Sequence, residues 1–344
     1  MKRILAVLAA AAALAGCGEK KDPTAGSAKL EPFTVMLDYQ PNADHAGIYA
    51  AQATGLYRKA GLDVKIVTPP DPSAPLKLLL AGRADLAISY EPDFLLAQNQ
   101  GAKALVSVAA LVQRPLTTLM ALPAAKVHTP ADLAGKRVGT AGIPYQAAYL
   151  RTILKKAGVD PSSVKQTDVG FNLVPAMVSG KVAATLGAYW NVEGVQLRRD
   201  GKKPVIMRMD QLGVPTYDEL VLVVRKQSLD VAGASRLRRF LQATADATRQ
   251  LKTNPQVGVD ALMAADPGLD RGLLEASVKA TLPAFFPEDA KNPWGYQDPP
   301  AWARYEVWMR ANGLLGHQPS DDPPLTNEFL PGVSPNDATP ADGL

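Results

Sequence analysis

Residues 33–47 read FTVMLDYQPNADHAG, an apolar run followed at once by a polar loop that leads into a helix. We expect a strand over Phe33–Leu37, a helix over Ala46–Ala60 that ends at Gly61, and a second strand over Asp63–Val67. Apolar, β-branched runs predict the strands, and a glycine just after a helical stretch favours its end. A strand, a helix and a strand in this order indicate a βαβ unit.

The same alternation continues along the chain. The further strands that we expect are Asp85–Ser89, Ala104–Val112, Leu116–Leu122, Arg137–Thr140, Val164–Asp168, Ala183–Leu186 and Glu219–Val224, and the chain is then helical to about Gly313. This rhythm predicts an α/β fold with a parallel sheet and helices on both faces. Two such cycles and a late strand predict two lobes, the first of them discontinuous.

Composition excludes several classes of protein. The chain has 344 residues, which suggests two domains, and a single Cys, which excludes a disulfide framework, an iron–sulfur cluster and a multi-cysteine zinc site. Its 37 Lys and Arg against 33 Asp and Glu form no basic stripe with interleaved aromatics, so nucleic acid is not an expected partner. The three histidines are far apart and no catalytic motif is present, so we expect no enzyme, no cofactor and no metal.

The N-terminus carries an export pattern. Lys2 and Arg3 precede the apolar run Ile4–Leu14, which is too short to span a membrane. The run ends in Leu-Ala-Gly-Cys at residues 14–17, which looks like a bacterial lipobox, so we expect cleavage after residue 16, acylation of Cys17 and attachment to the membrane. Residues 17–31 are predicted to be a flexible tether.

Ligands of open α/β sheets bind where loops follow the carboxyl ends of strands. The first such loop, residues 38–47, gathers a carboxylate, an amide, a phenol and an imidazole, although helix capping by Asn42 or Asp44 with an exposed His45 explains it too. Residues 89–91 are either a second ligand loop or a cap with a packing tyrosine. The glycine turn at residues 139–145 is neither a P-loop nor a dinucleotide fingerprint.

Residues 189–193, Tyr-Trp-Asn-Val-Glu, are the most informative stretch. An aromatic platform beside an amide and a carboxylate suits a flat heterocycle with amino groups, whereas the alternative is a Trp packed in the core and a solvated Glu193. The complete set of candidate ligand-binding residues is Asp38, Tyr39, Asn42, His45, Ser89, Tyr90, Glu91, Tyr145, Tyr189, Trp190, Asn191 and Glu193.

Several of these segments resemble a known family. Gln40–Tyr49, Ala53–Tyr57, Gly82–Ala87, Leu133–Gly139 and Tyr189–Glu193 are similar to substrate-binding lipoproteins of ABC importers in the thiamine-pyrimidine group, which are related to fungal thiamine-pyrimidine synthases. The likeness covers most of residues 33–331. It implies a type II periplasmic-binding fold in which two lobes close on a small molecule, with a permease and an ATPase as partners and an extracytoplasmic, lipid-anchored location.

The resemblance also implies where the parts lie. Lobe 1 takes residues 32–117 and 216–331, lobe 2 takes residues 118–215, and residues 332–344 form a tail. An aminopyrimidine is the implied ligand, with Asn42, His45, Tyr90, Trp190 and Glu193 lining the cleft. Riboflavin, or an anion such as an alkylsulfonate or nitrate, is the alternative ligand. A synthase-like enzyme with His45 as reactant is the alternative from another class, although the fungal cysteine-rich motif is missing.

Overall fold

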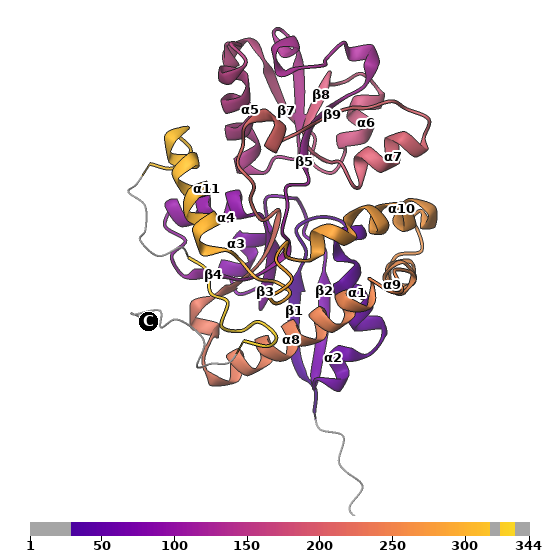
Figure 1. Ribbon diagram of the computed structural model, residues 1–344, viewed down its shortest axis with the longest axis vertical. Coiled ribbons are helices and arrows are strands. Elements are labelled where there is room, and N and C mark those ends of the chain that lie inside the picture. The colour runs from indigo at the N-terminus through magenta and orange to yellow at the C-terminus, as the bar shows by residue number, and fades with distance from the viewer. Residues whose placement is uncertain (1–28, 317–323, 334–344) are drawn as a thin grey trace, which may run out of the picture.

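One lobe is built on a five-stranded sheet in the order β2-β1-β3-β10-β4 (Figure 1). In the computed structural model, which describes residues 29–316 and 324–333, these strands are β1 (Glu31–Met36), β2 (Leu62–Val67), β3 (Leu86–Ser89), β4 (Leu105–Val112) and β10 (Leu220–Arg225). β1 pairs in parallel with β2 and β3, whereas β10 runs antiparallel to β3 and to β4. The late strand β10 therefore fills the gap between β3 and β4.

The other lobe has a second five-stranded sheet, in the order β7-β6-β8-β5-β9. Its strands are β5 (Thr117–Ala121), β6 (Arg137–Thr140), β7 (Lys165–Asp168), β8 (Ala184–Tyr189) and β9 (Val205–Arg208). β6 is parallel to β7 and β8, and β5 is antiparallel to β8 and β9. The predicted α/β fold with two lobes is confirmed, but each sheet is mixed rather than parallel.

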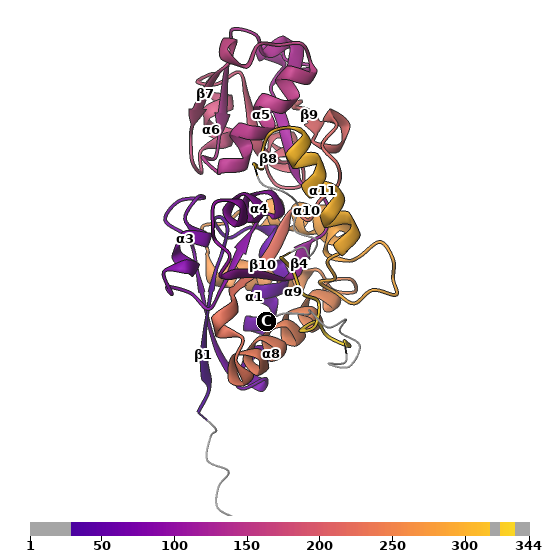
Figure 2. The ribbon, with the colours of Figure 1, turned by 90° about the vertical axis from the view of Figure 1, so that its left-hand side faces the viewer.

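Helices surround both sheets, as the two perpendicular views show (Figures 1 and 2). The first lobe holds α1 (Ala46–Ala53), α2 (Leu56–Lys59), α3 (Pro75–Leu80), α4 (Glu91–Asn99), α8 (Val231–Gln250), α9 (Gln256–Ala265), α10 (Arg271–Thr281) and α11 (Pro299–Ala311). The second lobe holds α5 (Pro144–Lys156), α6 (Leu173–Val178) and α7 (Glu193–Arg199). The helix predicted over Ala46–Ala60 is split because Gly55 adopts a φ of +73°, which ends α1 before α2 begins.

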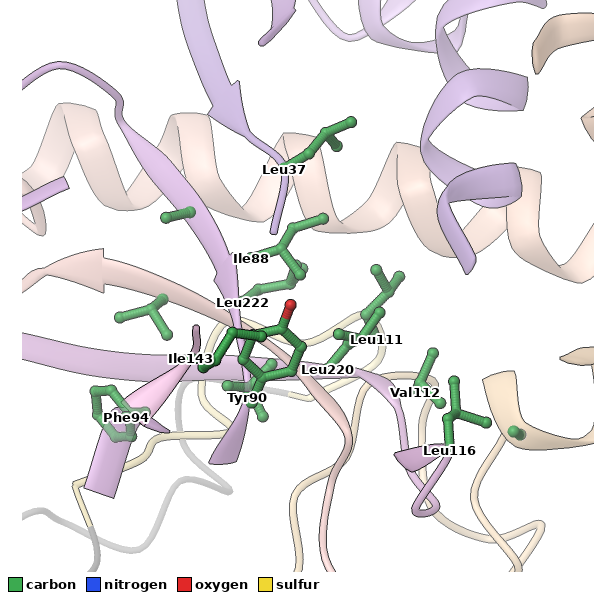
Figure 3. Close-up of a cluster of buried hydrophobic side chains, with 14 of the residues drawn as sticks. Leu37, Ile88, Tyr90, Phe94, Leu111, Val112, Leu116, Ile143, Leu220 and Leu222 are labelled. Carbon is green, nitrogen blue, oxygen red and sulfur yellow. The ribbon is translucent and has the colours of Figure 1, made fainter. Parts of the chain in front are cut away.

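A cluster of buried apolar side chains lies where the central strands of the first lobe meet the segments that cross to the second lobe (Figure 3). Ile88 of β3, Leu111 of β4 and Leu222 of β10 are all buried there. Every residue of β4 is buried, which is typical of a strand covered on both faces. Each fully buried Leu or Ile contributes about 1.5–3 kcal/mol.

Two crossing segments join the lobes, and Glu219 holds them together. Its Oε2 accepts hydrogen bonds from the backbone N–H of Leu116 at 2.6 Å and of Thr117 at 2.9 Å, and from the Tyr217 hydroxyl at 3.1 Å. Its Oε1 accepts from the Thr117 hydroxyl at 2.7 Å. Burial raises the pKa of Glu219, and these bonds offset part of that effect. The buried Glu219 carboxyl therefore links the two crossing segments, which we call the hinge.

Besides the two crossing segments, aromatic side chains connect the lobes. Tyr149 of α5 packs edge-on against Trp308 of α11, with ring centroids 5.9 Å apart, and its hydroxyl bonds that of Tyr305. Residues 1–16, Cys17, and most of the predicted tether and tail lie outside the described residues, so the predictions made for them stay predictions.

Candidate ligand cleft

A cleft lies between the lobes. The first lobe lines it with side chains that follow β1 and β3: Asp38, Tyr39, Asn42 and Tyr90. The second lobe contributes Ala141, Ile143, Gln146, Leu173, Gly187, Tyr189, Val192 and Glu193. Six of the residues predicted from the sequence thus come together in the cleft, namely Asp38, Tyr39, Asn42, Tyr90, Tyr189 and Glu193.

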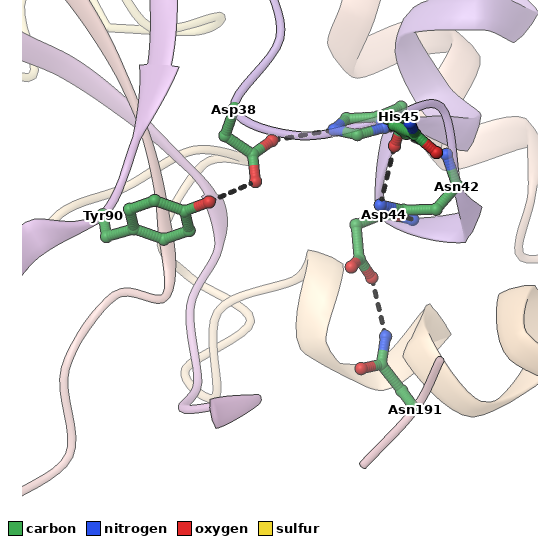
Figure 4. Close-up of polar contacts among 7 residues, drawn as sticks. Asp38, Asn42, Asp44, His45, Tyr90 and Asn191 are labelled. Carbon is green, nitrogen blue, oxygen red and sulfur yellow. Dashed lines mark hydrogen bonds and ion pairs between the residues drawn. The ribbon is translucent and has the colours of Figure 1, made fainter. Parts of the chain in front are cut away.

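Asp38 is held from two sides (Figure 4). Its Oδ1 lies 2.8 Å from His45 Nε2, and its Oδ2 accepts the Tyr90 hydroxyl at 2.9 Å. His45 Nδ1 accepts the backbone N–H of Asn42 at 3.2 Å, so in the neutral ring the proton sits on Nε2 and is donated to Asp38. His45 is fully buried, and we assign it the role of positioning Asp38.

Asn42 combines capping with a place in the cleft. Its Oδ1 accepts the backbone N–H of Asp44 at 2.8 Å, at the start of the short 3₁₀ helix Ala43–His45. Its Nδ2 donates to the carbonyl of Gln40 at 3.1 Å. Asn42 therefore caps the helix, as one explanation of this loop required, and it also lines the cleft. The exposed His45 of that explanation is wrong, because His45 is fully buried.

Glu193 places a carboxyl group in the cleft from the start of α7. Its Oε2 accepts the backbone N–H of Tyr189 at 2.7 Å, and the same helix start supplies a backbone bond that also favours the charged form. Burial dominates and raises the pKa of Glu193 to about 7. A group with this pKa accepts or donates a hydrogen bond near neutral pH, according to its partner.

Gln146 and Gly187 line the cleft but were missed by the sequence reasoning. Gln146 Oε1 accepts the backbone N–H of Ala141 at 2.8 Å, which fixes the amide so that Nε2 serves as a donor. Gly187 has a φ of +119°, and a Cβ there would lie 2.9 Å from Gln146 Cδ. Gly187 directly follows the strand predicted over Ala183–Leu186, and a glycine at that point is the signal that could have indicated this close approach.

Asn191 and Asp44 join the lobes beside the cleft rather than lining it (Figure 4). Asn191 Nδ2 donates to Asp44 Oδ1 at 2.6 Å and to the Thr281 hydroxyl at 2.6 Å. Asp44 Oδ2 has no hydrogen-bond partner, and burial raises the pKa of Asp44 to about 7. Three buried polar side chains thus connect the loop before α1, the end of β8 and the end of α10.

The other predicted site residues lie elsewhere. Ser89 is buried within β3, and Tyr145 bonds the Thr117 hydroxyl at 3.1 Å near the hinge. Glu91 accepts the backbone N–H of Asp218 at 2.7 Å. Trp190 donates its indole N–H to the carbonyl of Pro115 at 3.1 Å, and the Arg208 guanidinium covers its ring at 4.9 Å.

The aromatic surfaces of the cleft are therefore tyrosine rings, not the predicted Trp190 platform. Tyr39 meets Phe171 of the second lobe edge-on, with centroids 4.7 Å apart, and Tyr90 lies 5.5 Å from Tyr145. Burial raises the pKa of Tyr39, Tyr90 and Tyr189, so these phenols stay neutral.

Within residues 29–316 and 324–333, no three His, Cys, Asp or Glu side chains gather closely enough to hold a metal ion. No helix among the described residues is both long and apolar enough to cross a bilayer.

The sequence matches a family model described as NMT1/THI5 like over residues 42–257. The chain belongs to this family. It is 33% identical over 315 residues to the formylaminopyrimidine-binding protein of Halalkalibacterium halodurans, an alignment that covers 91% of this chain and 94% of the relative. It is 26% identical to the 4-amino-5-hydroxymethyl-2-methylpyrimidine phosphate synthase of Legionella pneumophila, over 73% of this chain and 79% of the relative.

Among solved structures, the chain is similar to a Candida albicans protein described as having the generic periplasmic binding protein fold. The TM-score is 0.61 at 16% identity, with 84% of this chain and 92% of the other covered. This likeness concerns the fold alone.

Proposed function

We propose that this NMT1/THI5-like chain is the extracytoplasmic binding protein of an ABC importer and that its ligand is a thiamine-related aminopyrimidine. The similarity to the formylaminopyrimidine-binding protein of Halalkalibacterium halodurans supports a binding protein for this class of compound. Binding would proceed by hinge closure, and the transporter would recognise the closed form.

One observation carries the choice of ligand. Gln146 Nε2 is a fixed donor and Glu193 presents an acceptor, while tyrosine rings supply flat apolar surface. An aminopyrimidine has the complementary set: ring nitrogens that accept, an exocyclic amine that donates, and a planar face.

The same cleft is less suited to the anionic alternatives. None of the described residues that line it is Lys or Arg, so an alkylsulfonate or nitrate would lack a basic partner.

The enzyme alternative requires His45 as a reactant. Both of its ring nitrogens are engaged, with Asp38 and with the backbone of Asn42, and its side chain is fully buried. We therefore favour binding over synthesis. Incubation with pyridoxal phosphate tests this choice: a pyrimidine product that disappears in His45→Asn would overturn it.

Calorimetry with formylaminopyrimidine, hydroxymethylpyrimidine, thiamine and riboflavin tests the ligand. We expect a pyrimidine to bind with 1:1 stoichiometry, Glu193→Gln to weaken it at least tenfold, and the exposed control Glu275→Gln to leave it unchanged. No heat with any of the four compounds, or heat with riboflavin alone, would contradict the proposal. Acylation at Cys17 and globomycin-sensitive processing test the anchor, and Cys17→Ser should still bind ligand.

A further inference from the structure

The hinge carries a second cavity, which shares no residue with the ligand cleft. Both crossing segments line it, through Gln113 and Arg114 on one and residues 216–218 on the other. Glu91 at the start of α4 and Trp302 of α11 complete its inner wall. These two helices lie against one another, since the ring centroids of Phe94 and Trp302 are 6.0 Å apart.

The walls of this hinge cavity are rich in acidic side chains. Five acidic residues line it: Glu91, Asp218, Glu288, Asp289 and Asp298. Among the described residues that line the cavity, one is basic, namely Arg114. Its guanidinium already lies 3.7 Å from the Glu288 carboxylate at the exposed rim. The inner acids Glu91 and Asp218 therefore have no cationic partner from the cavity wall.

One carboxyl oxygen of Glu91 lacks a hydrogen-bond partner. The residue is 1% exposed, and its Oε2 accepts the backbone N–H of Asp218 at 2.7 Å. Its Oε1 is buried and has no hydrogen-bond partner. Burial raises the pKa of Glu91 well above its ordinary range and that of Asp218 to about 7. A bound cation would lower both pKa values and supply the missing donor.

Aromatic rings define what kind of cation fits. Tyr217, Tyr296 and Trp302 line the same cavity as the acids, and the Trp302 indole N–H donates to Asp218 Oδ2 at 2.8 Å. Carboxylates next to aromatic faces recognise organic ammonium ions, because the rings attract the charge and contact the carbon chain. The acids do not gather into a metal-binding group among the described residues.

We propose that the hinge cavity binds a primary alkylammonium ion. Its N–H groups donate to Glu91 Oε1 and to the Asp218 carboxylate, and its carbon chain packs on Tyr217 and Trp302. The site differs in residues, charge and ligand class from the cleft, so its occupation is separate from that of the cleft.

Titration of the full chain with n-butylammonium chloride, followed by calorimetry and by the indole N–H resonance of Trp302, tests this site. We expect one ion per chain, a shift of that resonance, and at least tenfold weaker binding in Glu91→Gln. Asp200→Asn removes an exposed charge in the second lobe and should leave binding unchanged. Equal binding of neutral 1-butanol, displacement by Mg²⁺, or unchanged affinity in Glu91→Gln would overturn the proposal.

A second variant covers a failure of Glu91→Gln to fold. Asp298→Asn alters a half-exposed acid at the cavity rim, and we expect it to weaken n-butylammonium about threefold. Identical binding in Asp298→Asn and the unaltered chain, without a shift of the Trp302 resonance, would show the ion to bind elsewhere. The pyrimidine titrations do not enter this test, so the two proposals fail independently.

Discussion

Replacing Asp44 by Asn should stabilise the protein at alkaline pH. The pKa of Asp44 rises from its ordinary value of 3.8 to about 7, mainly through burial. Between these values the native state keeps a proton that the unfolded chain has released, so stability falls as the pH rises. Because each pKa unit corresponds to about 1.4 kcal/mol, the decrease between pH 5 and pH 8 is about 3 kcal/mol.

The substitution removes the ionisable carboxyl group, and with it this pH dependence, and it keeps the hydrogen bonds that Oδ1 accepts. In Asp44→Asn the amide oxygen still accepts from Asn191 and from Thr281, as Asp44 Oδ1 does at 2.6 and 3.3 Å. Urea unfolding of both proteins at pH 5 and pH 8 measures the effect. We expect the gain from Asp44→Asn to be about 3 kcal/mol larger at pH 8 than at pH 5. Asp200→Asn is the exposed control.

The pKa of Asp218 is also raised to about 7, but Asp218 is not among the groups that shift the pKa of Asp44, so its contribution cancels in the comparison. The Glu193 charge does raise the pKa of Asp44, as the smallest of its causes. An equal gain at the two pH values would refute the assignment of a buried, protonated Asp44 between the lobes.

Three further predictions concern the cleft and the hinge. Gly187→Ala should weaken pyrimidine binding at least tenfold in calorimetry, because the new Cβ displaces the Gln146 amide; unchanged affinity would remove Gln146 from the site. Glu219→Gln should lower the free energy of unfolding by about 2 kcal/mol in urea, since one oxygen that accepts hydrogen bonds becomes a donor. Trp190→Ala should lower the melting temperature but change ligand affinity less than threefold; a tenfold loss would place Trp190 in contact with ligand.

Much of the architecture is readable from local patterns. Strand ends located Asp38, Tyr90 and Glu193, because the loops after β1, β3 and β8 converge on one cleft. Strand direction is not readable in this way: β10 and β5 reverse the parallel order because each enters its sheet from the opposite lobe. β9 was not predicted, since Val205–Arg208 is an edge strand of only four residues.

The missed or displaced site residues depend on contacts far apart in the sequence. Gln146 looks like an ordinary helix residue until α5 brings it against Gly187, 41 positions away. Trp190 follows a strand as a platform residue would, yet its indole N–H donates to the Pro115 carbonyl and the Arg208 guanidinium lies over its ring. Neither outcome is encoded in neighbouring residues.

The position of β10 has a consequence for synthesis on the ribosome. All strands of the second sheet lie between residues 117 and 208, so that lobe is complete before Leu220 is made. The first sheet stays split until β10 arrives, with β3 and β4 lacking their shared partner. A nascent chain therefore exposes two apolar strand edges for the whole time in which the second lobe is translated, and the lobe that starts first finishes last.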